Sequence, residues 1–237
     1  KPIFEKALYF ENIKQVLNPK TLVDRFFQYF IDSGGQFVSQ HVRGVVHLNS
    51  GVRVHLQDNN HFDSHRIVIS SGAFSRQIEG CDAEKLPLET ERGYNIQYAG
   101  RQDLVNRPVA WNEAGFYAVP TNEALRFSGT VEIAGLTPRK NQKRIDYLVK
   151  KSKQMFDLNE QPSSDWLGFR PTMPDSLPVI GPSPNSPNTW YALGHQHLGL
   201  TLSGITGKII SELISKENPC LDIEPYSATR FKTLKNK

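Results

Sequence analysis

A glycine-bracketed loop between a strand and a helix is the strongest chemical signal in the sequence. The apolar run 189–193 predicts the strand, Gly194 and Gly199 bracket the loop, and a helix is expected from Leu200 onward. Glycine lets a backbone approach a ligand closely, and a helix start presents unpaired N–H groups and the positive end of the helix dipole. The segment ending at Leu200 and Thr201 therefore predicts stabilisation of an anion or an electron-rich carbonyl. An ordinary strand-loop-helix connection has the same pattern.

Two histidines, His195 and His197, lie on this loop. On an extended loop they would face the same way, so a metal-binding pair is conceivable. A structural or catalytic zinc site needs at least three protein ligands, and the sequence shows no third one at a suitable spacing. We therefore predict no metal site and expect His195 to line the ligand site.

A stiff, proline-punctuated segment, 166–181, carries a single arginine, Arg170. Its prolines restrict the backbone and oppose a helix. A guanidinium held on such a frame suits bidentate capture of a carboxylate. The alternative is that Arg170 pairs with a structural carboxylate such as Asp175, and the residues alone do not separate the two.

A third signal is the short motif Ser70, Ser71 and Gly72. It begins at the last residue of the run 66–70, whose centre is apolar. The run is typical of a strand buried on both faces in a parallel sheet. Ligands of α/β sheets bind at the carboxyl ends of such strands. The motif is therefore a candidate ligand contact, although it carries little information by itself.

Apolar spacing indicates the elements that must position these segments. Asn18-Pro19 and the apolar residues up to Ile31 predict an amphipathic helix, closed by Gly34-Gly35. The predicted strands before residue 71 are 36–40, 42–48, 52–57 and 66–70, the second and third forming a hairpin. In the last helix, Leu202, Ile205, Ile209 and Leu213 form the expected buried stripe, and Gly204 and Gly207 are expected to allow tight packing against a sheet.

The middle of the chain has a sequence pattern typical of short strands. Short β-rich pieces fill residues 86–135, and an antiparallel sheet explains them most economically. They are 92–99, 108–111, 115–119, 124–128 and 130–134, followed by a helix over about 141–156. The predicted fold class is therefore α/β in part and α+β overall.

Composition restricts the function classes. With 237 residues and 38% hydrophobic content, the chain can bury a sizeable core. The net charge of +4 comes from basic residues spread along the chain, whereas nucleic-acid binding needs a clustered basic face, so we expect no nucleic-acid partner. The two cysteines are far apart in sequence and suggest a reducing compartment. No apolar run is long enough for a membrane span.

Together these segments resemble the D-amino-acid oxidase/dehydrogenase superfamily of FAD-dependent oxidoreductases, which also includes glycine and sarcosine oxidases. The subgroup that looks most similar is the bacterial D-amino-acid dehydrogenases, including relatives that act on D-hydroxyproline. The motifs are 168–171, 174–181, Gly194-His195, Gly199-Leu200-Thr201 and Thr206-Gly207, with 88–94 and 128–132 upstream. The resemblance covers essentially the whole chain.

The resemblance implies roles for individual residues. The backbone of Val42 would touch the adenine side of FAD, and Ser70, Ser71 and Gly72 would lie near its ribose and pyrophosphate. The loop Gly194, His195, Gly199, Leu200 and Thr201 would embrace the isoalloxazine ring. Arg170 would bind the substrate carboxylate, with Tyr94, Tyr117 and His195 as further substrate contacts. Phe74 stands where many relatives have tryptophan.

One part of the family pattern is absent from the sequence. No GxGxxG motif after a strand, with an acidic residue about twenty positions on, occurs in the chain. The family carries that motif at its N-terminus, and the first residue here is Lys1. We expect an incomplete FAD-binding Rossmann-like domain, 16–85 and 166–237, and an antiparallel-sheet substrate domain, 1–15 and 86–165. A missing N-terminal segment or a partner chain would supply the motif.

The resemblance implies hydride transfer from the substrate Cα to flavin N5, giving an imino acid that water hydrolyses to a 2-oxo acid. The protein would act in bacterial amino-acid catabolism, with a quinone or the respiratory chain as electron acceptor. It would be cytoplasmic or peripheral on the inner face of the membrane. The alternatives are a glycine- or sarcosine-type oxidase that uses oxygen, and a non-catalytic partner subunit that kept the fold.

Overall fold

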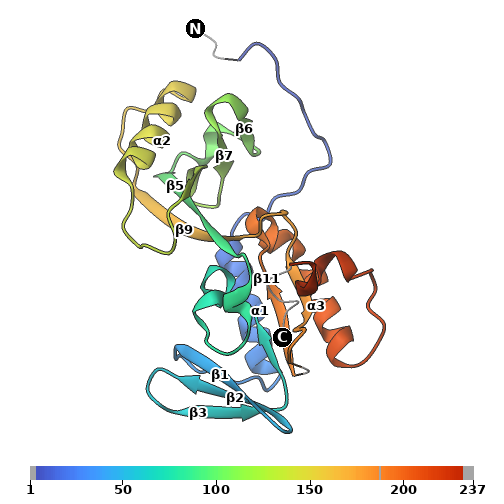
Figure 1. The fold of residues 1–237 in the computed structure, drawn as a ribbon. Coiled ribbons are helices and arrows are strands. Elements are labelled where there is room, and N and C mark those ends of the chain that lie inside the picture. Colours follow the sequence, from blue (N-terminus) through green and yellow to red (C-terminus); the bar gives the residue numbers. More distant parts are fainter. Residues whose placement is uncertain (1–3, 187, 232–237) are drawn as a thin grey trace. The chain divides into compact units, whose positions relative to one another are not determined.

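The chain divides into two compact units. A computed structural model describes residues 4–186 and 188–231; residues 1–3, 187 and 232–237 lie outside the described part. The first unit comprises Lys1–Gln36, Arg92–Glu132 and Pro138–Gly168, and the second comprises Phe37–Glu91, Ile133–Thr137 and Phe169–Lys237. Figure 1 labels their elements along the chain. These boundaries place 16–36 with the first unit, whereas the assignment of the predicted domains to cofactor and substrate stays a prediction.

The second unit contains two small sheets and a helix. The first sheet is an antiparallel meander of β1 (Val42–Leu48), β2 (Gly51–Leu56) and β3 (His61–Ser64). The other sheet has the order β10 (Val179–Pro182), β11 (Thr189–Leu193) and β4 (Ile67–Ile69), and α3 (Gly199–Ile214) packs on it. β10 and β11 are antiparallel, whereas β11 and β4 are parallel. This parallel pair confirms the predicted Rossmann-like character of the region around Ser70.

The first unit is built on an antiparallel sheet, as predicted. Its order is β6 (Val109–Trp111), β7 (Phe116–Pro120), β8 (Ala124–Ile133), β5 (Glu89–Ala99) and β9 (Ser164–Thr172). β5 and β9 also include residues of the second unit. The predicted strands 124–128 and 130–134 form the single strand β8, in which Thr130 has a positive φ of 61°.

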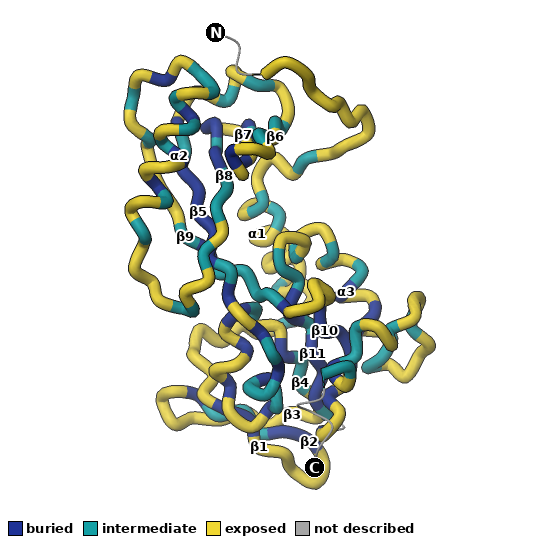
Figure 2. Tube along the Cα trace, turned by 45° about the horizontal axis from the view of Figure 1, so that its top comes forward, coloured by how far each residue is buried: buried dark blue, intermediate teal, exposed yellow. Residues whose placement is uncertain are grey.

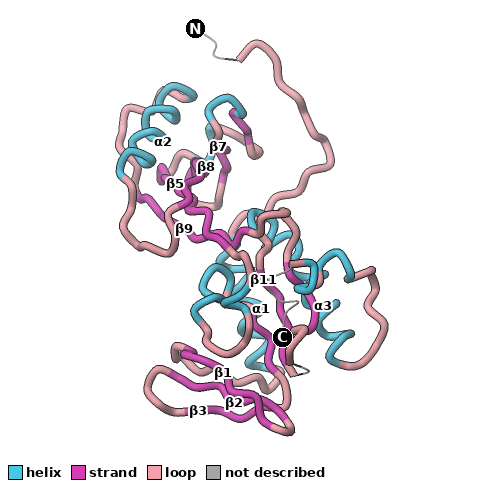
Figure 3. The backbone as a smooth tube through the Cα atoms, viewed as in Figure 1, coloured by secondary structure: helices cyan, strands magenta, loops and turns pink. Residues whose placement is uncertain are grey.

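One face of this sheet packs against α2 (Gln142–Met155), whose N-cap is Asn141. The apolar side chains of alternate strand residues form this core with two residues of α2. They are Tyr94, Ile96, Tyr98, Phe116, Ala118, Leu125 and Phe127 from the strands and Ile145 and Leu148 from the helix. Figure 2 shows the buried residues along β5 and β8, and Figure 3 shows α2 and the strands by type. Strand alternation places the intervening residues on the opposite face.

The helix α1 (Pro19–Asp32) forms where predicted, with Asn18 as its N-cap and Pro19 as its first residue. None of its residues is buried, so its apolar stripe packs into none of the three hydrophobic cores. Val23, Phe26 and Phe30 remain 57%, 64% and 48% exposed. The prediction of an amphipathic helix is confirmed, whereas burial of its apolar face is not observed.

Several predicted elements differ from the structure. Residues 36–40 form no strand, although their spacing alternates. The proline-punctuated segment 166–181, for which only a helix was excluded and no strand predicted, contains the end of β9 and the start of β10. Both strands lie at sheet edges, where a residue without an N–H breaks no internal ladder. The expected tight packing at Gly204 and Gly207 is wrong, because a Cβ at either position would meet nothing within 4 Å.

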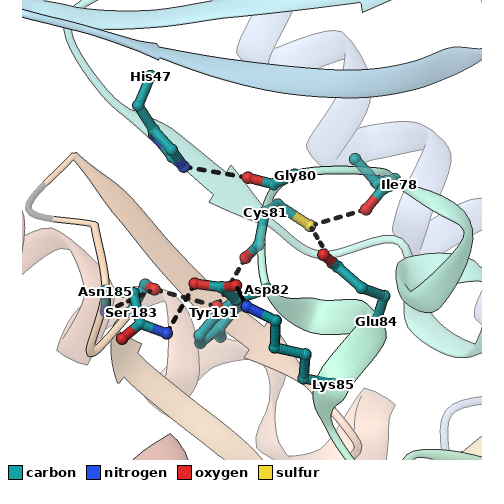
Figure 4. A network of polar contacts seen from close by, with 10 residues as sticks. All are labelled: His47, Ile78, Gly80, Cys81, Asp82, Glu84, Lys85, Ser183, Asn185 and Tyr191. Carbon is teal, nitrogen blue, oxygen red and sulfur yellow. Dashed lines mark hydrogen bonds and ion pairs between the residues drawn. The ribbon is translucent and has the colours of Figure 1, made fainter. Parts of the chain in front are cut away.

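A polar network, buried only around Tyr191, joins the hairpin, the segment after β4 and the second sheet of this unit (Figure 4). The Tyr191 hydroxyl donates to the Cys81 carbonyl at 2.7 Å and contacts Ser183 Oγ at 3.1 Å. His47 contacts the Gly80 carbonyl at 3.0 Å, and Asn185 donates to Asp82 at 2.8 Å. These contacts hold the two sheets of the unit in a fixed relation to the strand ends that carry the candidate site.

Cys81 and Cys220 should differ sharply in reactivity. Cys81 is 1% exposed, and burial raises the pKa of its thiol to about 11, whereas Cys220 is free and exposed. Because the thiolate is the reactive form, we expect one fast-reacting thiol in the folded chain and two after unfolding. Titration with an aromatic disulfide reagent measures both values. Two fast thiols in the folded chain would contradict the placement of Cys81.

Among the described residues, no helix combines the length and the apolar composition needed to cross a membrane.

Candidate functional site

The carboxyl ends of two parallel strands define the candidate site in the second unit. Ile69 is the last residue of β4 and pairs with Tyr191 of the parallel β11. Because the strands are parallel, Ser70 and Gly194 leave the sheet at the same edge. Ser70, Ser71 and Gly72 thus lie on the same side as the loop before α3. Gly72 has a φ of 57° and starts a short 3₁₀ helix without a side-chain cap.

The end of β9 lies beside the Ser71-Gly72 turn. A Cβ at Gly72 would lie 4.0 Å from Pro171 Cγ, and the rings of Phe74 and Phe169 are 5.8 Å apart in an edge-to-face arrangement. Arg170 is therefore held next to the predicted cofactor contacts by residues on either side of it in sequence.

Arg170 has a desolvated guanidinium without a hydrogen-bond partner. Its Nη1 atom is buried and donates to no partner among the described residues. Burial lowers the pKa of Arg170, and the nearby Glu91 carboxylate opposes this shift. The group still remains charged at physiological pH because a guanidinium loses its proton only in strong base. A buried cation without a hydrogen-bonded partner is what a carboxylate-binding arginine presents before its ligand arrives.

The structure does not pair Arg170 with Asp175. Asp175 pairs with Arg230, whose Nε lies 2.6 Å from Asp175 Oδ2. Burial, the largest single effect, would raise the pKa of Asp175, but the hydrogen bonds from Arg230 and the Leu177 amide, together with the charge of Arg230, outweigh it, and the pKa lies below its ordinary value. Asp175 therefore already has its cation in Arg230, and the carboxylate that acts on Arg170 is Glu91.

Gly194 is required by both its dihedral and its surroundings. Its φ is 81°, and a Cβ would lie 2.7 Å from Met173 Cγ in a side chain that is 1% exposed. Gln196, on the same loop, also donates to the Met173 carbonyl at 3.3 Å. The loop is thus anchored on the segment that follows Arg170.

The substitution Gly194→Ala is expected to lower the free energy of unfolding by about 3 kcal/mol, from left-handed strain and overpacking together. Gly135→Ala is the matched control, since Gly135 also has a positive φ but no atom within 4 Å of its Cβ position. That control should lose only about 1 kcal/mol. Urea unfolding of both variants measures the difference, and equal losses would show that Met173 yields at no cost.

The two histidines of the loop have separate partners. His195 Nε2 lies 3.0 Å from Thr206 Oγ1, and burial lowers the pKa of His195, so the ring is neutral at physiological pH. His197 Nε2 lies 3.3 Å from Glu91 Oε2 and is 53% exposed. Glu91 therefore links His197 to the surroundings of Arg170, a role that the sequence reading missed.

The start of α3 matches the predicted anion-stabilising feature. Its first residues are Gly199, Leu200 and Thr201, and Leu198 provides no side-chain cap for their amides. Leu200 is 40% exposed, and Thr201 is exposed as well. The backbone N–H groups at the helix start therefore donate to no capping side chain.

The remaining predicted contacts have different surroundings. Val42 is the first residue of β1, in the other sheet of the second unit, next to a register irregularity. Tyr94 is 1% exposed, and its hydroxyl contacts Glu132 at 2.7 Å, Arg92 at 3.0 Å and the Asn141 amide at 3.1 Å. Tyr117 is 56% exposed. Tyr94 therefore has little hydrogen-bonding capacity left for a substrate, whereas Tyr117 has an accessible ring.

The observed donor set fits a flavin cofactor. Two buried polar atoms at the end of β9, Arg170 Nη1 and Thr172 Oγ1, have no partner in the described chain. Gly72 leaves open space at a strand end, and the capless α3 offers amides. Polar groups of this kind, gathered at the carboxyl ends of parallel strands, suit the carbonyls and phosphates of a dinucleotide.

Comparison with known proteins defines the class of this chain. Residues 1–213 match the family described as DAO, FAD dependent oxidoreductase. The chain belongs to this family, whose cofactor is FAD.

Several relatives of the chain are named for an enzymatic activity. A D-amino-acid oxidase of Bradyrhizobium diazoefficiens is 31% identical over 97% of this chain and 56% of its own length. A glycine oxidase of Pseudomonas aeruginosa is 24% identical over 94% and 62%, and a D-amino acid dehydrogenase of Vibrio atlanticus is 28% identical over 80% and 46%. The chain thus spans about half to three fifths of the length of these relatives.

The fold of the chain is also similar to that of a solved flavoprotein structure. The crystal structure of glycine oxidase from Geobacillus kaustophilus superposes with a TM-score of 0.74 at 23% identity, over 82% of this chain and 53% of that one. The mixed architecture of helices and antiparallel sheets is therefore that of this group of flavoproteins.

Proposed function

We propose that the complete protein is an FAD-dependent dehydrogenase of D-amino acids, including D-proline-like ones. The observation that carries the proposal is the half-buried Arg170 beside the ends of β4 and β11, whose buried Nη1 atom has no hydrogen-bond partner among the described residues. The D-amino-acid oxidase and D-amino acid dehydrogenase among the relatives support an α-amino acid as its ligand.

In this proposal Arg170 binds the substrate carboxylate and fixes the position of Cα. A bidentate guanidinium sets direction as well as affinity, and holding a substrate in a reactive geometry removes much of the entropic barrier. Tyr117 and His195 line the substrate, and Tyr94 lies in β5, the strand that also carries Glu91. The neutral ring of His195 adds no charge to the site. No acid or base residue is assigned. A substrate whose amine is already neutral, because its ammonium proton has gone to solvent, needs no protein base before hydride transfer.

Bound FAD would supply a two-electron acceptor for the hydride of the substrate Cα–H bond, and water would hydrolyse the resulting imino acid to a 2-oxo acid and ammonia. Ser70, Ser71, Gly72 and the backbone of Val42 would hold the nucleotide part. Gly194, His195, Gly199, Leu200 and Thr201 would hold the ring. Free amides at the start of α3 would stabilise negative charge on the ring through the helix dipole.

We further propose that a segment outside these 237 residues seats the pyrophosphate, either in the same polypeptide or in a partner chain. The absence of a GxGxxG motif from the sequence supports this, because that motif forms the usual seat. The exposed apolar stripe of Val23, Phe26 and Phe30 also supports it, since such a face gains stability when another element covers it. The ranges 16–85 and 166–237 would then belong to the FAD-binding domain, and 1–15 and 86–165 to the substrate domain.

The alternative within the family is an oxidase of glycine or sarcosine type that passes electrons to oxygen. The glycine oxidase among the relatives favours it. Steady-state assays of the complete protein separate the two. Reduction of a quinone analogue by D-amino acids, with little peroxide, supports the dehydrogenase. Peroxide formed in equal amount to product, with no response to artificial acceptors, would exclude it.

A non-catalytic partner subunit is the alternative from another class. The chain is mixed with FAD in the presence and absence of the nucleotide-binding segment of a relative. A flavin spectrum that needs both components supports the enzyme, and no flavin binding in either mixture would favour the subunit. With a quinone acceptor, the enzyme would work in the cytoplasm or peripherally on the inner face of the bacterial membrane.

A further inference from the structure

Glu91, in β5, has a carboxylate with spare capacity to accept hydrogen bonds. Its side chain is 22% exposed, and among the described residues it accepts no hydrogen bond. Its one close polar contact there is the long one with His197, whose Nε2 lies 3.3 Å from Glu91 Oε2. A carboxylate has about four acceptor sites, so most of those of Glu91 remain available to a ligand.

Arg170 lies on the neighbouring strand. β5 and β9 are adjacent in their sheet, and Glu91 and Arg170 both belong to the second unit. Burial lowers the pKa of Arg170 and the charge of Glu91 opposes this shift, so the two groups lie within electrostatic reach of each other. They nevertheless form no ion pair or hydrogen bond with each other in the described chain. The second unit thus holds two opposite charges close together but out of contact.

The two charges differ in their access to solvent. Arg170 Nη1 is buried without a partner, whereas the contact of Glu91 is with His197, a ring that is 53% exposed. The cation is therefore in the drier part of this neighbourhood and the anion is nearer the solvent. A ligand with an anionic and a cationic group would place its anion at Arg170 and its cation at Glu91.

We infer that Glu91 binds the α-ammonium group of the substrate, and that Arg170 and Glu91 together select amino acids over carboxylic acids of the same shape. The inference rests on the proposed function, in which Arg170 binds the α-carboxylate. An amino acid carries both charged groups on one carbon, so two nearby charges of opposite sign complement it. A carboxylic acid without the amine gains at Arg170 but is repelled by Glu91.

The assignment of Glu91 concerns binding and not proton transfer. A carboxylate oxygen accepts a hydrogen bond from an ammonium group and from a neutral amine alike. The contact therefore persists after the ammonium proton has gone to solvent, and the amine stays in position while Cα reacts.

Calorimetric titration of the complete protein with two ligands of the same shape tests the inference. 2-Aminoisobutyrate is an amino acid without a hydrogen on Cα, so hydride loss cannot consume it, and pivalate has a methyl group in place of its ammonium. Wild-type protein should bind 2-aminoisobutyrate at least about tenfold more tightly than pivalate. Glu91→Gln should lower this affinity ratio by about 10- to 100-fold, the range of a charge-assisted hydrogen bond.

Glu89→Gln is the matched control. Glu89 is an exposed carboxylate of the same strand that accepts from the Thr90 amide at 2.8 Å and does not act on Arg170. It loses the same charge two positions away, and its affinity ratio should equal that of the wild type. Glu91→Asp, which keeps the charge on a shorter side chain, should recover part of the ratio lost in Glu91→Gln.

An equal change for both ligands in Glu91→Gln, in either direction, would overturn the inference, because Glu91 would then only alter the field at Arg170. A wild-type protein that binds both ligands equally, or neither, would overturn it as well. Failure of the proposed function has a different signature, since flavin that stays oxidised with every D-amino acid would refute that function. The affinity ratio would still decide whether Glu91 binds the ammonium group.

Discussion

Arg170→Met in the complete enzyme is expected to raise KM for D-amino acids by about 100-fold, which corresponds to the loss of a charge-assisted bidentate pair of about 3 kcal/mol. The reason is that the Arg170 guanidinium is desolvated and its buried Nη1 atom has no hydrogen-bond partner among the described residues. Arg170→Lys should recover only part of the affinity, because an ammonium is a point charge without the fork. Steady-state kinetics with D-alanine measure both variants.

Arg66→Met is the matched control for this experiment. Arg66 is exposed and precedes β4, at the end of the strand remote from Ser70. Arg66→Met removes the same charge from the same unit as Arg170→Met, and we expect it to leave KM for D-amino acids unchanged. An unchanged KM in Arg170→Met would remove Arg170 from the substrate site, whereas equal rises in both variants would indicate a loss of general electrostatic attraction.

Glu132→Ala is expected to lower the free energy of unfolding by about 3 kcal/mol, because it leaves the buried Arg92 without its carboxylate. Arg92 and Glu132 are 3.4 Å apart with side chains 5% and 16% exposed, and Glu132 also accepts from Tyr94 and Asn141. Urea unfolding of the 237-residue chain measures the loss.

The pH dependence of this loss has a defined sign. Hydrogen bonds from Asn141 and Tyr94 hold the pKa of Glu132 below its ordinary value. A depressed carboxyl pKa contributes stability above the unfolded value near 4.3, and this contribution disappears as the pH falls through the folded pKa. The difference between wild type and Glu132→Ala should therefore shrink in acid.

Glu160→Ala is the control, since Glu160 forms an exposed ion pair with Arg101 in the same unit. Exposed pairs contribute little, so its loss should be far smaller. Equal losses in the two variants would mean that the Arg92 network adds no more than a surface ion pair.

Local patterns were sufficient for most elements of the fold. Asn18-Pro19, the Asn49-Ser50-Gly51 turn and the apolar run before Ser70 each act over a few residues, and the structure has the helix, the hairpin and the strand there. The strands within 166–181 were not predicted, and the prolines there excluded only a helix. Edge position makes prolines tolerable, and edge position depends on strand order, which no local pattern contains.

The candidate site was predictable only in part for the same reason. The motif around Arg170 indicated a carboxylate clamp, but Asp175 was an equal candidate partner until Arg230, 55 positions away in sequence, was found paired with it. Glu91 likewise reaches Arg170 and His197 only through the fold. Tyr94 and Tyr117 were grouped as substrate contacts, although core packing of Tyr94 and Phe116 places Tyr94 and Tyr117 on opposite faces of the sheet.

Anaerobic mixing of the complete, flavin-loaded protein with paired D- and L-amino acids tests the central claim most directly. We predict that D-amino acids bleach the flavin absorbance at a saturable rate, that L-enantiomers do not, and that Arg170→Met raises the half-saturating concentration without changing the flavin spectrum. Bleaching by glycine or sarcosine but by no D-amino acid would contradict the account, as would a D-amino-acid reaction that is indifferent to Arg170.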